Sequence, residues 1–369
     1  MSRPDFIHLD CAAGVPMRPE LAAEYPTLVQ KFGLNPHGVT CYAEDARRAI
    51  LDAERRLLAL CGTTPAEAGV VWCANGTEAA NLALRGFPWK HGDAPLAIDL
   101  GAHPALHQTA KARNDRPRHG FLVGDGGARA PEPPAEAELV ALSAVNNETG
   151  VRWNGARPGS AAEATVLVDA CQAFGKHPLH WPSADLMILS SRKIGGPATG
   201  AALLYRRNLR LLPVITGGGQ QGGVRDGTLD TVGILLFAKA AETACAHQAE
   251  ALEAVTALNH ELRAGIEHLG HGGWPLFSPA DASPYICYFA IPGYEGAIVA
   301  RTLAQRYGIL VGTGSACSAE SSQTSPLLKS MGVPDNLARG AIRISFSAQS
   351  THEDLRAFLT ALPEVLHDY

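Results

Sequence analysis

The chain has 369 residues, 46% hydrophobic and 18% charged, and its formal net charge of −5 gives no support for direct nucleic-acid binding. No apolar run is long enough to span a membrane, because the best candidate, 231–246, contains Lys239 and Glu242. The N-terminus has no signal-peptide segment, and the eight cysteines form no CxxC pair. We therefore expect a cytoplasmic protein with reduced thiols, no metal site, and one large and one smaller domain.

The first part of the chain alternates strands and helices after an N-terminal arm at 1–14. Apolar residues at helical spacing predict a helix that Gly62 closes. A strand, a glycine turn and a helix follow at 69–86, with Gly76 and Thr77 where the helix begins. Free N–H groups there favour an anion, although a plain threonine cap would look the same.

Three more strands are predicted before residue 150. They cover 96–99, which His103 follows, 121–123, and a run from 138 that leads into Asn146 and Asn147. Paired amides of this kind can hold a carboxylate or a ring hydroxyl. Residues 152–164 contain Pro158 and two glycines, so we expect no long helix there and less cover on that side of the sheet.

The stretch 165–205 contains three short apolar strands, at 166–168, 186–189 and 201–205. Asp169 and Gln172 follow the first, and Ser190, Arg192 and Lys193 follow the second. Such apolar runs are typical of strands buried on both faces, and ligands of open α/β sheets bind beyond the carboxyl ends of the strands. With the strands before them, seven candidates predict an α/β domain with a mostly parallel sheet.

The remainder of the chain predicts a second, smaller unit. Six glycines at 217–227 indicate a backbone that needs freedom, and a long amphipathic helix with a bend follows at 231–270. Strands and helices then alternate, and small polar residues dominate 312–325, which contains Cys317. We expect a large domain at 15–255 and a small α+β domain made of 1–14 with 256–369.

The acid and the amine at successive strand ends suit pyridoxal phosphate. The Lys193 amine can form a Schiff base with the cofactor aldehyde, and Asp169 can keep the pyridinium nitrogen protonated. Taken singly, each residue is better explained as an exposed side chain, because charged residues are mostly exposed. The pair becomes informative only together with the motifs around it.

Those motifs resemble the cysteine desulfurases, which are pyridoxal-phosphate enzymes of the class V aminotransferase group. VDACQAFGKHPL and ADLMILSSRKIGGPATGAALLY are similar to the cofactor segment of that family, and GTGSACSAE is similar to the cysteine loop of its group I members. The resemblance extends from HLDCAAGVPMRPE at 8–20 to AIRISF at 341–346. It implies a fold type I enzyme, with a seven-stranded, mostly parallel sheet in the large domain and a small α+β C-terminal domain.

The resemblance also implies roles for named residues. Cofactor binding would fall to Gly76, Thr77, His103, Asp169, Gln172, Ser190, Arg192, Lys193 and, across a homodimer interface, Thr228. Arg343 and Asn147 would hold the carboxylate of L-cysteine. Lys193 would remove the Cα proton, His103 would stack on the ring and exchange protons, and Cys317 would take the sulfur as a persulfide. Arg192 stands where the family usually has histidine, and we expect it near the phosphate with Ser190 and Thr77.

Two other readings stay open. Another pyridoxal-phosphate enzyme of this fold, such as a C–S lyase, selenocysteine lyase or aminotransferase, would not need Cys317. A catalytically silent partner protein would keep the fold, but the intact set of site residues argues against it. The final predicted helix places Leu355, Phe358 and Leu362 at helical spacing to cover the small domain. We therefore expect a dedicated sulfur acceptor that docks near 312–325.

Overall fold

A central sheet of seven strands organises the computed structural model, which describes residues 6–113, 115–123, 132–179, 181–314 and 325–369. The strand order is β2-β8-β7-β6-β5-β3-β4. The strands are β2 (Ala68–Cys73), β3 (Leu96–Asp99), β4 (Arg118–Phe121), β5 (Leu139–Ser143), β6 (Thr165–Asp169), β7 (Leu186–Ser190) and β8 (Ala201–Arg206). All strand pairs from β4 to β7 are parallel, and β8 is antiparallel to both of its neighbours. The predicted fold class is confirmed, and six carboxyl ends share one edge.

One strand was predicted in the wrong place. The expected strand 121–123 begins at Phe121, where β4 (Arg118–Phe121) ends. Beyond Phe121 the Val123 N–H donates to the buried Asp99 carboxylate instead of continuing the ladder. The sheet pairing of β4 with β3 runs from Arg118 to Phe121.

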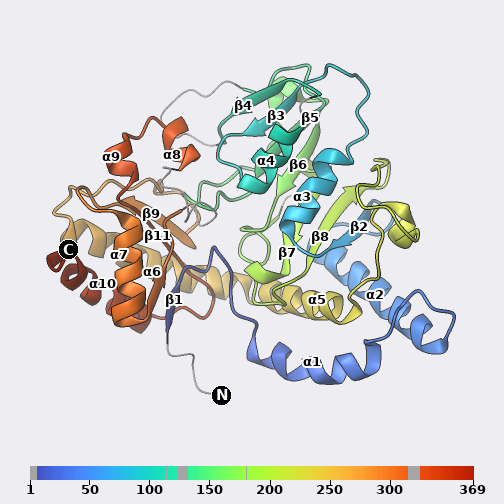
Figure 1. Cartoon of the computed structure of the whole chain (residues 1–369), viewed down its shortest axis with the longest axis horizontal. Coiled ribbons are helices and arrows are strands. Elements are labelled where there is room, and N and C mark those ends of the chain that lie inside the picture. Colours follow the sequence, from blue (N-terminus) through green and yellow to red (C-terminus); the bar gives the residue numbers. More distant parts are fainter. Residues whose placement is uncertain (1–5, 114, 124–131, 180, 315–324) are drawn as a thin grey trace.

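Helices cover both faces of the sheet (Figure 1). On one side lie α1 (Pro19–Phe32), α2 (Cys41–Leu60) and α5 (Thr231–Ala246), and on the other α3 (Gly76–Arg85) and α4 (Pro104–Ala112). Successive residues of a strand point to opposite faces of the sheet. Val166 and Val168 belong to the core under α2 and α5, and Leu167 belongs to the core under α3. This explains why the strands read as unbroken apolar runs.

The connection from β5 to β6 has no α-helix, as the sequence indicated. Its only helical piece is the 3₁₀ turn Gly159–Ala161. The expectation of less cover on that side was wrong, because Val166 and Val168 are fully buried. Trp153 and Trp181 pack against the same core and take the place of the missing helix.

A smaller unit packs beside the sheet at the left of Figure 1. It contains an antiparallel pair, β9 (Ile286–Ala290) with β11 (Ala341–Ser345), and a parallel pair, β1 (Ile7–Leu9) with β10 (Ile309–Val311). Its helices are α6 (Gln248–Leu269), α7 (Gly296–Tyr307), α8 (Pro326–Ser330), α9 (Asp335–Ala338) and α10 (His352–His367). In the part of the chain that the structure describes, no helix is long and apolar enough to cross a membrane.

The helix expected at 231–270 is two helices that meet at His247, which ends α5 and precedes α6. The residues of α5 belong to the core of the large sheet, and Val255, Leu258 and Leu262 of α6 belong to the core of the small unit. The N-terminal arm joins this second core through Leu9 and Ala12. The arm therefore reaches from the small unit across to the edge of the large sheet.

Candidate active site

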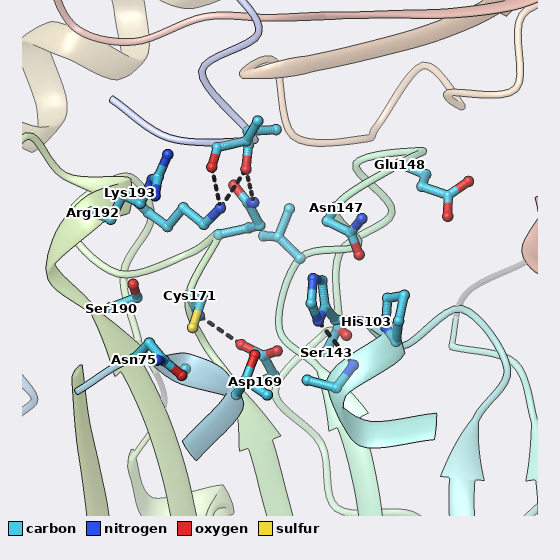
Figure 2. A pocket seen from close by; sticks show the side chains of 18 of the residues that line it. Asn75, His103, Ser143, Asn147, Glu148, Asp169, Cys171, Ser190, Arg192 and Lys193 are labelled. Carbon is cyan, nitrogen blue, oxygen red and sulfur yellow. Dashed lines mark hydrogen bonds between the residues drawn. The ribbon is translucent and has the colours of Figure 1, made fainter. Parts of the chain in front are cut away.

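A cavity of about 360 Å³ lies at the carboxyl edge of the large sheet, below the N-terminal arm and the small unit. Most of the predicted site residues line it: Gly76, Thr77, His103, Asn147, Asp169, Gln172, Ser190, Arg192, Lys193 and Arg343. They come from elements that are far apart in the sequence, so the fold brings the predicted set together. Figure 2 shows several of these side chains converging on one space.

Lys193 ends a 3₁₀ turn, Ser191–Lys193, that follows directly on β7. Its Nζ donates hydrogen bonds to the carbonyl oxygens of Ala12, at 2.7 Å, and Ala13, at 2.9 Å (Figure 2). Burial lowers the pKa of the Lys193 amine, and the nearby cation Arg343 adds to this. The amine is therefore closer to its neutral, nucleophilic form than an exposed lysine is.

Asp169 ends β6 and faces the middle of the cavity (Figure 2). Its Oδ1 accepts a hydrogen bond from the Cys171 N–H at 3.0 Å, which holds the carboxylate at the strand end. Burial raises the pKa of the Cys171 thiol well above its usual value, and the Asp169 charge raises it further. Cys171 is therefore a protonated thiol, as expected for a small buried residue rather than a nucleophile.

His103 precedes α4 and acts as its N-cap. Its Nδ1 accepts a hydrogen bond from the Ala105 N–H at 3.1 Å, so the neutral ring has its proton on Nε2. Burial lowers the pKa of His103, Lys193 and Arg343 act in the same direction, and the Asp169 carboxylate opposes them. The neutral ring can donate a hydrogen bond from Nε2. The protonated ring, which the Asp169 carboxylate favours, can give up a proton, and this suits an acid–base role.

An anion-binding corner lies at the start of α3. Asn75 caps this helix by accepting from the Glu78 N–H at 2.9 Å. The first N–H groups of a helix, here those of Gly76 and Thr77, have no partner inside the helix and favour an anion. A Cβ on Gly76 would lie 3.4 Å from the Cys171 Sγ, so the start of α3 lies directly against Cys171. Ser190 lines the same cavity.

Arg343 lies on β11 and is only 2% exposed. Its Nη1 donates to the carbonyl oxygens of Asn147, at 2.8 Å, and Gly314, at 3.3 Å, and its Nη2 pairs with the Asp10 carboxylate. Its Nε is buried without a hydrogen-bond partner in the described part of the chain. The guanidinium is thus fixed at the roof of the cavity, which is the side formed by the N-terminal arm and the small unit. There it can bind a carboxylate.

The Asp10 contact was not predicted. Gly312 makes room for it, since a Cβ there would lie 2.6 Å from the Asp10 Oδ1. The sequence signal was a single aspartate in the arm, and nothing in its spacing connects it with Arg343. Only the pairing of the arm with the small unit, including the bridge from Asp10 to Ser345, brings the two charges together.

The two neighbouring amides have different tasks. The Asn146 Oδ1 accepts from the Glu148 and Thr149 N–H groups, each at 2.8 Å, so this amide holds a turn. Asn147 lines the cavity, where Figure 2 shows its side chain. Glu148 was missed: it is buried, lines the cavity, and accepts from the Ser325 hydroxyl at 2.6 Å.

Arg192, Thr228 and Cys317 complete the set of predicted site residues. Arg192 is exposed, and its Nε lies 2.5 Å from where a Cβ on Gly14 would be, so its guanidinium lies against the arm. Thr228 is exposed and lines a separate cavity of about 140 Å³ beside Trp72. Cys317 lies outside the described residues.

Comparisons with known proteins agree with this geometry. The family model of class V aminotransferases matches residues 7–358. A cysteine desulfurase of Cereibacter sphaeroides is 32% identical over 98% of this chain and 95% of that protein. One from Gluconacetobacter diazotrophicus is 31% identical over 98% of this chain and 93% of that protein. A solved NifS-like protein has the same fold, with a TM-score of 0.88 at 24% identity over 99% of this chain and 100% of that one. The chain therefore belongs to the class V aminotransferase family, as a homologue of its cysteine desulfurases.

Proposed function

We propose that this chain is a pyridoxal-phosphate-dependent cysteine desulfurase, which converts L-cysteine to L-alanine and takes the sulfur on Cys317 as a persulfide. The observation that supports this best is the cavity itself, where Lys193, Asp169, His103 and Arg343 converge. Full-length similarity to cysteine desulfurases supports the choice of substrate.

The residues present fit the cofactor. The start of α3 at Gly76 and Thr77, with Ser190 opposite, offers N–H and hydroxyl donors for a phosphate dianion. Asp169 offers a carboxylate for a pyridinium nitrogen, and Gln172 offers an amide donor for the ring oxygen. Pyridoxal phosphate supplies an aldehyde for the Lys193 amine and a ring that accepts electrons from the substrate Cα.

The chain's own residues bind and orient the substrate. Arg343 and Asn147 lie together at the roof, where the guanidinium can bind the α-carboxylate with help from the amide. Lys193, whose pKa is lowered by burial, can take the Cα proton once its amine is free. The carbonyl oxygens of Ala12 and Ala13 hold that amine inside the cavity meanwhile.

The sulfur step needs a thiolate at Cys317. Its sulfur bonds to the substrate sulfur, the carbon–sulfur bond breaks, and the carbon keeps the electron pair and takes a proton to become the methyl group of alanine. His103 in its protonated form, which the Asp169 carboxylate favours, can supply this proton. A reductant then releases sulfide from the persulfide, or an acceptor takes the sulfur. This chemistry requires reduced thiols, so we propose a cytoplasmic location.

We also propose a homodimer in which Thr228 reaches the phosphate site of the other subunit. Thr228 is exposed on a glycine-rich segment, outside its own subunit's active cavity. Large apolar side chains are exposed along α1 and α2 and the segment between them, namely Tyr25, Leu34, Val39, Tyr42 and Leu51. Val39 is the most exposed of them, at 99%, and exposed apolar side chains that gather in one region support an interface there.

The domain division stays a proposal: residues 15–255 bind the cofactor, and 1–14 with 256–369 form the small domain. The persulfide would pass to a dedicated acceptor that docks near 312–325. The apolar face of α10 is used inside the small unit, where Leu355, Phe358 and Leu362 are fully buried. That helix therefore has no apolar face left for a general iron–sulfur scaffold. Efficient sulfur transfer to such a scaffold would contradict this proposal.

The decisive experiment incubates the purified protein with L-cysteine and a reductant and measures alanine and sulfide together. We expect equal amounts of both, formed only in the presence of pyridoxal phosphate. Pyruvate and ammonia in place of alanine would indicate a C–S lyase, and the absence of any turnover would indicate a silent homologue.

A further inference from the structure

A second lysine, Lys176, lies buried behind the active cavity. The residue lies in the turn after β6 and is 6% exposed. Its Nζ donates to the Gln172 Oε1 at 3.3 Å and lies 5.5 Å from the centre of the Tyr285 ring. The other groups that act on its charge are two cations, Lys193 and Arg343, and two thiols, Cys11 and Cys171. None of these four neighbouring groups is a carboxylate, so none of them pairs with the Lys176 cation as an aspartate or glutamate would.

This ammonium fixes the orientation of the Gln172 amide. An amide has one end that accepts and one end that donates hydrogen bonds. The Gln172 oxygen faces Lys176, which can only donate, and its Nε2 donates at 2.8 Å to the Ala12 carbonyl oxygen, which can only accept. Turning the amide over would place N–H groups against an ammonium and oxygen against oxygen. Only one orientation is compatible with both neighbours.

The arrangement is unfavourable for folding by itself. A buried cation without a paired carboxylate loses hydration that one amide cannot replace. Burial lowers the pKa of Lys176 to about 8, with Lys193 and Arg343 acting in the same direction. The arrangement strengthens hydrogen bonds that Gln172 donates, because a cation at its oxygen polarises the amide and makes its N–H groups stronger donors.

We propose that Lys176 is a positioning residue that holds the acceptor end of Gln172 away from the cavity and presents its N–H₂ group to the ring oxygen of the cofactor. This inference rests on the proposed function. Gln172 lines the active cavity, and Lys176 acts on the cofactor only through this amide.

The test measures cofactor binding in place of turnover. The apoprotein is titrated with pyridoxal phosphate, and the dissociation constant and the absorbance maximum of the holoprotein are recorded for Lys176→Met, Gln172→Leu and the double variant. Methionine keeps the length and suits a buried site. Lys111→Met, at an exposed position of α4, is the matched control and should behave like the wild type.

We expect each single variant to raise the dissociation constant about tenfold, which corresponds to about 1.4 kcal/mol, and to shift the absorbance maximum. In the Gln172→Leu background, Lys176→Met should change the constant by less than about twofold, because the two residues act as one unit. Single effects that multiply in the double variant would overturn the inference, as would a wild-type constant and spectrum for Lys176→Met.

A second variant keeps the test valid if Lys176→Met does not fold. Lys176→Gln keeps a donor without the charge and should give a smaller rise in the dissociation constant, again only when Gln172 is present. The outcome also separates this inference from the proposed function. Wild-type protein that binds no pyridoxal phosphate would refute the function, whereas normal binding by all Lys176 variants would refute only the role of Lys176.

Discussion

The floor and the roof of the active cavity are held in different ways. On the floor, His103 and Asp169 follow sheet strands and are fixed by backbone N–H groups two residues further along, at Ala105 and Cys171. At the roof, Arg343 is fixed by Asp10, 333 positions away in the sequence. These two side chains of the floor are therefore held locally by the large sheet. The roof exists only when the arm and the small unit have packed together.

This difference separates what each part can do. Floor residues keep their geometry as long as the sheet is folded, so we assign them to cofactor binding and proton transfer. Roof residues depend on contacts between segments that are distant in the sequence, and we assign them to binding of the substrate carboxylate. Changes on the floor should affect the chemistry, and changes at the roof should affect substrate binding.

The largest effect is expected at Lys193. Lys193→Ala should lower desulfurase activity by at least about 10³-fold, because both the cofactor linkage and the general base are lost. Borohydride should couple pyridoxal phosphate covalently to the wild type and not to the variant. Peptide mapping by mass spectrometry locates the linkage. A modified peptide that contained Lys176 instead would show that the floor has been assigned to the wrong amine.

Cys317→Ala changes a residue that we assign to neither the floor nor the roof and that lies outside the described residues. The variant should keep the cofactor and its spectral change with L-cysteine, because the floor and roof are intact. It should lose sulfide release and the alkylatable persulfide. Cys41→Ala, which removes an exposed thiol outside the predicted site, is the control and should leave both signals unchanged. Undiminished sulfide from Cys317→Ala would favour the C–S lyase.

The floor could be predicted from the sequence, and most of the roof could not. Strand ends show in the apolar pattern, so Asp169 and Lys193 were found by position, and the family resemblance supplied His103 and Arg343. The Asp10–Arg343 pair and the Ser325–Glu148 hydrogen bond join distant segments without any periodic signal. Gln172 lines the cavity as one of the predicted site residues, but its hydrogen bond to Lys176 is a contact that only the folded chain contains.

Asp99 offers a structural counterpart to Asp169 on the floor, because it ends β3, which is separated from β6 by β5 alone. Burial raises its pKa from 3.8 to about 6, although the Gly101 and Val123 N–H groups oppose this. Between these two values the folded state binds more protons than the unfolded state, so stability should fall as pH rises from about 4 to about 6. The full effect is up to about 3 kcal/mol. Asp99→Asn should remove this slope in urea unfolding at a series of pH values; an unchanged slope would assign it to another group.

At the roof, Arg343→Lys should raise the KM for L-cysteine about tenfold and change kcat much less. Lysine keeps the charge but loses the two-pronged geometry that matches a carboxylate. Asp10→Asn should raise KM by a smaller factor, about threefold, because the guanidinium keeps its other contacts to Asn147 and Gly314. Steady-state kinetics over a wide range of L-cysteine concentrations separate the two constants. A fall in kcat at constant KM would show that Arg343 acts in the chemical step. It would contradict the assignment of roof residues to substrate binding.

The smallest effect is expected at Arg192, which lies between floor and roof. It stands beside Lys193 in the sequence, yet its guanidinium lies against Gly14 of the arm and the residue is exposed. A permanent cation near the phosphate site should still favour the dianion, but solvent and salt weaken it. Arg192→Ala should raise the dissociation constant for pyridoxal phosphate about threefold at low ionic strength, and the difference should shrink as salt is added. Arg207→Ala, at another exposed position just past β8, serves as the control. An unchanged constant at low salt would show that Arg192 only braces the arm, and that the phosphate is held by the floor alone.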